Sequence, residues 1–179
     1  VLVAFPGAEV LTTVVDRSAV PARLRGARPS ALQHVPGATS HHEWLLPLMP
    51  LAWRMMAPPS GVDAVVSSSH ACAKAVPFED GTPHLCYCHT PMRYAWDQFD
   101  AYFGPQRVGR VASAALKPVM NRLARWDRDT AHRPNRYLAI SQYVARRISL
   151  YYNRQSAIVY PPVDTEAFTP GGPDRRGAF

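Results

Sequence analysis

Short apolar runs that alternate with helical patterns constrain the fold of this chain more than any other feature. The runs are rich in β-branched residues and lie between Pro, Gly, Asp and Ser, which is typical of strands. Strands that alternate with helices indicate βαβ units and a Rossmann-like α/β fold, with a mostly parallel sheet and helices on both faces. The strands are expected at residues 8–15, 62–69, 84–89, 136–141 and 156–162.

Helical spacing marks the segments between these runs. Apolar side chains recur every three to four residues within residues 116–132, and Pro134 follows as a stop signal. Ser141 is suited to be the N-cap of a helix over residues 142–152. Residues 41–56 are also expected to be helical, although two prolines interrupt them.

The composition fits one globular domain. The chain has 179 residues, of which 47% are hydrophobic, and this is enough to bury a core. No apolar run is long enough to span a bilayer, and the N-terminus lacks the pattern of a signal peptide. Three cysteines, an odd number, do not make a disulfide framework. We therefore expect the protein to be cytoplasmic and to act at the inner face of the cell membrane.

The net charge of +7 comes almost entirely from arginine, because only Lys74 and Lys117 of the 20 basic residues are lysines. Arginine prefers phosphates and carboxylates as partners, so an anionic ligand or surface is one interpretation. A general enrichment in Arg, Ala and Pro is the other. The arginines are scattered and no reader motif is present, so we expect no nucleic-acid partner.

Ligands of open parallel sheets bind beyond the carboxyl ends of the strands, and polar residues gather there in this sequence. His70 follows the second expected strand, with Lys74 one turn further on, and His89 and Arg93 follow the third. Ser141 ends the fourth. Histidines and cations close to helix N-termini suit a ligand that carries phosphate.

Each of these residues also has a purely structural interpretation. His89 could be a buried histidine with satisfied hydrogen bonds, and His70 a polar residue in a first helical turn. Lys74 could lie at the surface, and Ser141 could be only a cap. Arg93 could stack at the edge of the core, or it could bind an anion beside aromatic rings that pack against a sugar.

The stretch "CYCH" does not have the spacing of a zinc site. Cys86 and Cys88 lie two apart in an expected strand, so they point to the same face as His84, and no second ligand pair follows. Buried cysteines that act as small apolar residues explain the pair better, and we expect no metal. His89 then falls on the opposite face, where the strand ends.

Five segments, in this order, resemble the N-terminal half of a family 4 glycosyltransferase. They are "SSSHACAK", "CYCHTPMRYAWDQFD", "LARWDRDTA", "RYLAISQYVARRI" and "VYPPVDTEAFTP", and the similarity covers nearly the whole chain. The branch that they most resemble contains the mannosyltransferase-like enzymes of O-antigen and exopolysaccharide assembly. The resemblance implies a GT-B enzyme, in which two Rossmann-like domains face each other across a cleft and transfer retains configuration without a metal.

The resemblance also implies the domain organisation. Residues 1–168 correspond to the acceptor-side domain, in which Asp164 and Phe168 come last, and residues 169–179 to the start of an interdomain linker. The family's first strand and glycine-rich loop, and its C-terminal GT-B domain, are then expected to lie outside this sequence. The donor, with GDP-mannose as the expected example, would bind mainly to that domain, and no other cofactor is expected. Residues 1–179 alone are expected to be inactive.

His89 of "CHTP" matches the family's cleft histidine and is the expected catalytic residue. The resemblance implies transfer of a hexose, mannose first, to a saccharide or lipid-diphosphate acceptor. Residues 41–56, which contain two tryptophans, could meet an anionic membrane there or could simply pack on the sheet. The expected substrate-binding residues are His70, Lys74, Thr90, Arg93, Tyr94, Trp96 and Ser141.

Two other functions are compatible with parts of the sequence. A non-catalytic, basic Rossmann-like module that binds an anionic ligand or partner is the main alternative. A fragment of a sugar-nucleotide epimerase or dehydrogenase is disfavoured, because the chain has neither G-x-G-x-x-G after a strand nor a Tyr-x₃-Lys pair.

Overall fold

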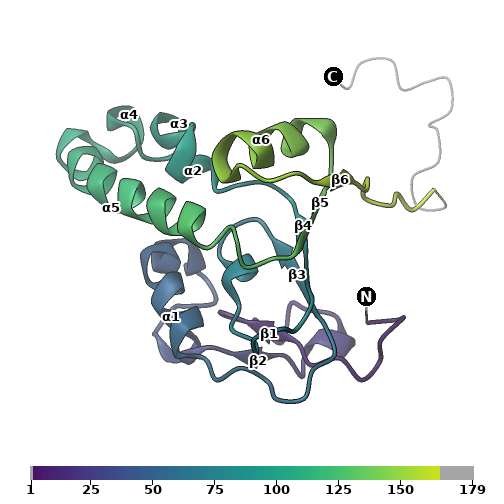
Figure 1. The fold of residues 1–179 in the computed structure, drawn as a ribbon. Helices are drawn as coiled ribbons and strands as arrows, with labels where there is room; N and C mark the ends of the chain where they lie inside the picture. Colours follow the sequence, from purple (N-terminus) through teal and green to yellow (C-terminus); the bar gives the residue numbers. More distant parts are fainter. Residues whose placement is uncertain (1, 166–179) are drawn as a thin grey trace, which may run out of the picture.

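The computed structural model describes residues 2–165, apart from the side chain of Glu43, and shows an α/β domain (Figure 1). Its main sheet has four parallel strands that follow one another in sequence order. These are β3 (Val65–Ser69), β4 (His84–Cys88), β5 (Arg136–Ala139) and β6 (Ala157–Ile158). A separate parallel pair consists of β1 (Leu11–Thr12) and β2 (Arg28–Pro29).

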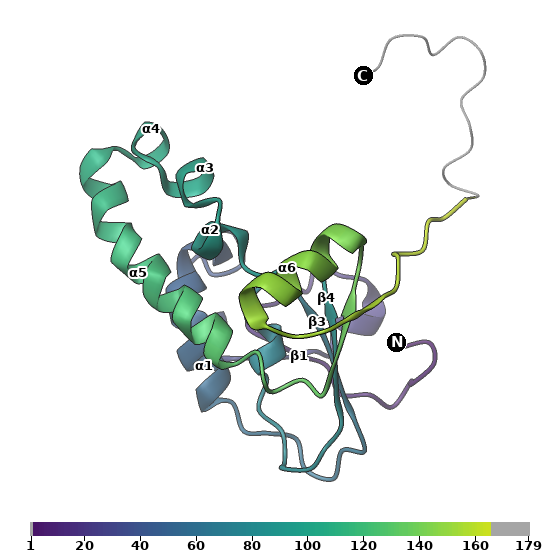
Figure 2. The ribbon, with the colours of Figure 1, turned by 45° about the horizontal axis from the view of Figure 1, so that its top comes forward.

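Six α-helices and four 3₁₀ helices accompany the described strands. Figures 1 and 2 both show α1 beside the C-terminal half of α5. The α-helices are α1 (Met49–Met55), α2 (Arg93–Trp96), α3 (Phe99–Phe103), α4 (Pro105–Val108), α5 (Arg110–Asp129) and α6 (Gln142–Tyr152). The 3₁₀ helices are η1 (Ala22–Leu24), η2 (Ala31–His34), η3 (His42–Leu48) and η4 (Ala73–Ala75).

The predicted α/β fold class with a parallel sheet is confirmed, and so is the cap of α6, because the Ser141 side chain accepts a hydrogen bond from the Val144 amide at 3.2 Å. The strand expected at residues 8–15 is only two residues long. Its partner β2 ends at Pro29, which has no N–H to add to the ladder. The expected linker at residues 169–179, and Phe168 before it, lie outside the described residues.

Two helical segments differ from the prediction. The helix expected to begin near residue 116 begins at Arg110, directly after Gly109, whose positive φ of 84° suits glycine. Residues 41–56 form η3 followed by α1, and Pro47 lies inside η3. A proline ring removes one helical hydrogen bond, and this favours the tighter, shorter 3₁₀ form in this half of the segment.

Alternation along the strands buries one face of the main sheet. His84, Cys86 and Cys88 of β4 are buried, and Tyr137 and Ala139 of β5 lie beside them. Helix α6 covers this group, and the predicted burial of the two cysteines is confirmed. The helices pack mainly on this face, and Val66 on the other face is 44% exposed.

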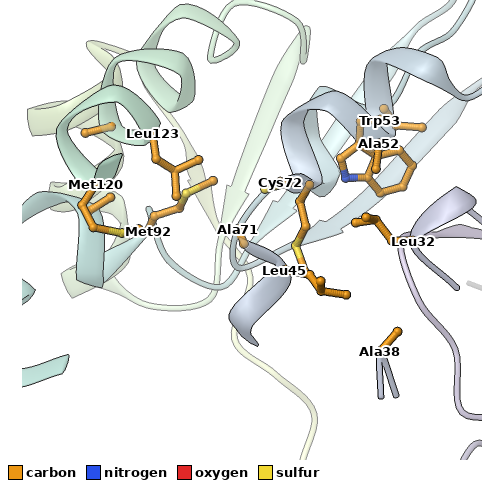
Figure 3. Close-up of a cluster of buried hydrophobic side chains, with 14 residues drawn as sticks. Leu32, Ala38, Leu45, Ala52, Trp53, Ala71, Cys72, Met92, Met120 and Leu123 are labelled. Carbon is orange, nitrogen blue, oxygen red and sulfur yellow. The ribbon is translucent and has the colours of Figure 1, made fainter. Parts of the chain in front are cut away.

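A second apolar cluster joins the N-terminal segments to α5. Figure 3 shows Ala52 and Trp53 of α1 close to Leu32, while Met120 and Leu123 of α5 lie near Met92. The cluster therefore fixes η2, α1 and α5 around the loops that leave β3 and β4. These loops carry most of the residues predicted to bind a ligand.

A buried ion pair ties the same loops to the helices. Lys74, just after β3, pairs with Asp127 near the end of α5, and the two side chains are 1% and 0% exposed. The other carboxylate oxygen, Oδ2, accepts hydrogen bonds from Trp96 Nε1 at 2.8 Å and from the Tyr152 hydroxyl at 2.9 Å. Four elements, η4, α2, α5 and α6, thus meet at one carboxylate.

Removing one partner of this pair should be strongly destabilising. We expect Lys74→Met to lower the free energy of unfolding by about 3–5 kcal/mol, because it leaves a buried carboxylate without its cation. Adding Asp127→Asn should recover part of the loss, since the amide is neutral and its oxygen still accepts hydrogen bonds from Trp96 and Tyr152. Urea denaturation measures both. The exposed control Lys117→Met should stay within about 0.5 kcal/mol of wild type, and an equally small effect of Lys74→Met would contradict the role of the pair.

A second prediction concerns His84, which is 1% exposed and shares a 2.8 Å hydrogen bond between its Nε2 and the Ser67 hydroxyl. Burial, and then the charge of Arg133, lower the pKa of His84 from 6.5 to about 4. Between these pH values the unfolded state binds a proton that the folded state does not. The free energy of unfolding should therefore fall as the pH drops from 6.5 towards 4, by up to about 3 kcal/mol.

Urea denaturation at neutral and at acidic pH tests this dependence. His84→Gln should be less stable than wild type at pH 7 but should lose less stability on acidification. The exposed His132→Gln is the matched control and should keep the wild-type dependence. If His84→Gln and wild type lose the same stability on acidification, His84 is not its source.

Candidate functional site

A cleft of about 880 Å³ lies at the carboxyl ends of β3 and β4. Its lining also includes residues of β1, η3, α1, α3 and α5, so that it lies between the N-terminal segments and the main sheet. A large apolar part of the lining consists of Leu46, Met49, Trp53, Phe103, Leu116 and Met120. The polar part of the lining includes Ser68 within β3 and the residues His70, Thr90 and Arg93 that follow the two strands.

The pairing of β3 with β4 brings the predicted residues to one level. Ser69 lies opposite Cys88, and the His89 amide donates a 2.8 Å hydrogen bond to the Ser69 carbonyl. The residues that come next in each chain, His70 and Thr90, both line the cleft. The sequence prediction that the ends of these two strands form one polar edge agrees with this register.

His70 lies near one permanent cation, Arg93, and two further imidazoles, those of His42 and His89. Its pKa is lowered from 6.5, first because the surroundings partly desolvate the ring and then because His89, His42 and Arg93 disfavour a further positive charge. A neutral imidazole in a positively charged environment can donate or accept one hydrogen bond and can gain a proton when an anion arrives. The edge therefore has the electrostatics of an anion site.

His89 lies beside the cleft. Its Nε2 shares a 2.9 Å hydrogen bond with the Ser68 hydroxyl, and its ring packs edge-on against Tyr87 at 5.4 Å between centroids. Ser68 lines the cleft, so the imidazole is held at the margin through this hydroxyl. The ring is half-buried, neither sealed in the core nor free to rotate.

Tyr94 adds a buried polar atom to the cleft. Its ring packs against Tyr102 and Phe103, with centroids 5.9 and 6.4 Å away. Burial raises the pKa of Tyr94, and among the described residues its hydroxyl has no hydrogen-bond partner. A buried hydroxyl without a partner loses the hydrogen bonds that water would give, so a ligand oxygen in the cleft could restore one.

The structure corrects two expected binding residues. Lys74 does not line the cleft, because its ammonium group is committed to Asp127 in the core. Trp96 has its Nε1 bound to the same carboxylate, and its ring stacks on Tyr151 at 4.7 Å, with the Arg128 guanidinium 5.0 Å from its centroid. Neither side chain is available to a substrate in this arrangement.

Ser141 lies at the carboxyl end of β5, as predicted, but it is not part of the cleft lining. Its side chain caps α6. Seven polar residues that line the cleft were missed by the sequence analysis. These are Thr12, Thr13, Asp16, Thr39, His42, Ser68 and Tyr102.

Nothing in the local sequence of these residues marks them as ligands. His42 belongs to a segment that was predicted only to be helical, and Tyr102 lies in a run of aromatic residues. Asp16 is exposed, and its Oδ1 accepts hydrogen bonds from the Ser18 hydroxyl at 2.6 Å and the Ser18 amide at 2.9 Å. These bonds lower the pKa of Asp16, so it stays ionised and is poorly suited to move a proton at neutral pH.

Within residues 2–165, no group of three or more His, Cys, Asp or Glu side chains could hold a metal ion. No helix in that range combines the length and the apolar character that crossing a membrane requires.

The model of a protein family described as Glycosyltransferase Family 4 matches residues 8–167. No curated protein and no solved structure matches the chain.

The charge cluster around His70 can be tested by its titration. In a histidine NMR titration, we expect His70 to have a pKa below 6.5 and Arg93→Gln to raise it, because one nearby positive charge is removed. Arg146→Gln, an exposed substitution on α6, should leave the titration of His70 unchanged. An unperturbed His70, or equal effects of the two substitutions, would show that the cluster does not exist in solution.

Proposed function

The chain belongs to glycosyltransferase family 4, and from this premise we propose that it forms the acceptor side of a retaining transferase. The transferred group is a hexose, with mannose from GDP-mannose as the first candidate. A second, nucleotide-binding GT-B domain would hold the donor across the cleft. The acceptor is a lipid-diphosphate carrier or a growing saccharide that such a carrier bears.

The observation that carries this proposal is the unequal lining of the cleft. One part contains His70 and Arg93, with Thr90 and Ser68 as neutral hydrogen-bonding groups. Charge-assisted hydrogen bonds from such groups are well suited to a phosphate or diphosphate. Arg93 with the hydrogen-bonding groups of His70, Thr90 and Ser68 is therefore suited to an acceptor that carries phosphate.

The apolar part of the lining points to the rest of the acceptor. Leu46, Phe103 and Leu116 are half-buried and present apolar surface to the cleft. Burying a hydrocarbon chain there would contribute roughly 25 cal/mol for each Å² removed from water. A lipid-linked phosphate could bind to both the polar and the apolar part of the cleft lining, whereas a free saccharide has neither a phosphate for the first nor a hydrocarbon chain for the second.

We assign His89 to the reacting end of the sugar. The Ser68 hydrogen bond fixes the ring through Nε2, and within residues 2–165 Nδ1 makes no hydrogen bond. Nδ1 is therefore free to bind a hydroxyl of the transferred hexose or an oxygen of the leaving phosphate. Such a contact contributes to the rate when it strengthens as charge separates in the transition state.

The reaction proposed is a front-face displacement. The acceptor hydroxyl oxygen forms the new bond to the anomeric carbon, the bond from that carbon to the diphosphate oxygen breaks, and the departing phosphate takes the hydroxyl proton. A double displacement would need a carboxylate nucleophile next to the sugar. Asp16, the carboxylate that lines the cleft, is exposed and bonded to Ser18.

Substitution of His89 tests the assignment in the full-length enzyme. His89→Ala should lower kcat by about 10²-fold or more, the scale of one lost electrostatic or proton-transfer group. His132→Ala is the matched control, because His132 is an exposed histidine outside the cleft, and it should retain wild-type turnover. A folded His89→Ala enzyme with near-normal turnover would remove His89 from the mechanism.

The transferase activity itself is tested with radiolabelled nucleotide sugars and a lipid-diphosphate acceptor, after thermal-shift screening has identified the donor. Transfer that requires the lipid-diphosphate acceptor is the expected result. Binding of an anionic lipid without transfer from any nucleotide sugar would instead support the non-catalytic basic module.

A further inference from the structure

The segment formed by η3 and α1 has apolar residues on two opposite sides. One side faces the core through Leu45, Met49, Ala52 and Trp53, which are all less than 10% exposed. The other side faces outward through Trp44, Leu48, Leu51 and Met55, which are 79%, 47%, 54% and 70% exposed. We call the second set the outer stripe. Leu48, Leu51 and Met55 follow one another every three to four residues, the spacing of one α-helical face, and Trp44 lies before them in the 3₁₀ helix η3.

An outer stripe of this kind is unusual in a surface helix. The face of such a helix that points away from the core is normally polar, and large contiguous apolar patches on a protein mark an interaction surface. Single exposed apolar residues scattered by chance do not explain the outer stripe well, because it contains four large side chains: one tryptophan, two leucines and one methionine. The stripe therefore calls for an apolar partner.

A shallow groove of about 290 Å³ extends this surface from α1 to α5. Its floor includes Pro50 and Leu51 from one side and Val119 and Leu123 from the other, and α1 and α5 lie side by side in Figures 1 and 2. Two arginines, Arg54 of α1 and Arg122 of α5, also line it. Apolar surface and guanidinium groups are thus combined in one place.

The surrounding chain carries more positive than negative charge. Helix α5 contains five basic residues and two acidic ones, Asp127 and Asp129, and Asp127 is paired with Lys74 in the core. In the η3–α1 segment itself Arg54 is accompanied by a single acid, Glu43. A partner that offers both hydrocarbon and negative charge would complement this surface, whereas a neutral apolar partner would leave the arginines without counter-charges.

We propose that the outer stripe and the Arg54–Arg122 groove form a docking surface for an anionic lipid bilayer. Trp44, Leu48, Leu51 and Met55 enter the boundary between head groups and acyl chains, as the apolar face of an interfacial helix does. The two arginines bind lipid phosphates. This goes beyond the proposed transferase reaction, because the surface would bind membrane whether or not a sugar is transferred.

The position of the cleft gives the docking surface a consequence. Pro47 lines both the groove and the cleft, and Trp44 of the outer stripe also lines the cleft. A bilayer bound to the stripe would therefore lie next to the cleft. An amphipathic acceptor could move from the membrane into the cleft without exposing its hydrocarbon chain to water.

Vesicle co-sedimentation of the full-length protein, without any nucleotide sugar, tests this proposal. We expect binding to vesicles of phosphatidylcholine mixed with phosphatidylglycerol to exceed binding to pure phosphatidylcholine at least tenfold, and to weaken with salt. Binding should also shift the tryptophan emission to the blue. Trp44→Phe should abolish most of the shift but keep the binding, because Trp44 is the tryptophan that lies exposed in the stripe.

Paired substitutions separate the two parts of the surface. Arg54→Gln with Arg122→Gln should weaken binding to the mixed vesicles about 25-fold, or about fivefold for each cation near an anionic leaflet. Leu51→Gln with Met55→Gln should weaken binding to both kinds of vesicle. The matched control is Leu150→Gln with Arg146→Gln on α6, where Leu150 is 73% exposed, and it should bind as wild type.

All substituted positions are exposed or line the open groove, so thermal unfolding should match wild type and confirm that each variant folds. Wild-type protein that ignores the anionic lipid, or stripe variants that bind as the α6 control does, would overturn the proposal. So would a dimer, detected by sedimentation velocity, that Leu51→Gln with Met55→Gln dissociates while vesicle binding is absent. The stripe would then be a contact between two copies of the chain.

Discussion

The pairing of Lys74 with Asp127 is the interaction on which the arrangement of the site depends. Taking both charges out of water is costly, and the cost is offset only when the remaining hydrogen-bonding capacity is used. Trp96, Tyr152 and Thr130 meet that requirement, with Thr130 Oγ1 3.3 Å from the Lys74 ammonium nitrogen. Each of these donors or acceptors lies on a different part of the chain. A shift of η4, α2 or α6 would therefore leave a buried polar group unpaired. Because the loops at the carboxyl ends of β3 and β4 lead into η4 and α2, these loops are held in place as well.

The buried hydrogen bonds around Lys74 and Asp127 hold the loops beside the cleft in place, while the polar residues of the cleft stay accessible. His70 and Arg93 come from the loops that the network anchors, and both side chains are exposed. His89 is fixed by a single hydroxyl, that of Ser68, at the boundary between sheet and cleft. The buried residues around Asp127 thus fix the position of the site, while the exposed His70 and Arg93 are accessible to a ligand. Both are needed where a substrate must be aligned before charge develops.

Much of the fold could be predicted from the sequence, because it depends on local patterns. The period-two burial of His84, Cys86 and Cys88, and the Ser141 cap of α6, use interactions between residues near one another in the chain. The role of Lys74 could not be predicted in this way. Its partner is 53 residues away, and a lysine near a strand end has the same local sequence whether it binds a ligand or a buried carboxylate. The same is true of Trp96, whose aromatic neighbours suggested a sugar platform. His42 enters the cleft from η3, and no motif around it indicates this.

The order of the main sheet has a consequence for the way the chain acquires its structure. Strands β3, β4, β5 and β6 stand beside one another in the order in which they occur along the chain. Each new strand can therefore pair with the one synthesised just before it, and no strand must wait for a later one to be inserted at its side. The domain can thus assemble progressively during translation, and the Lys74–Asp127 bond closes only after the long helix α5 has emerged.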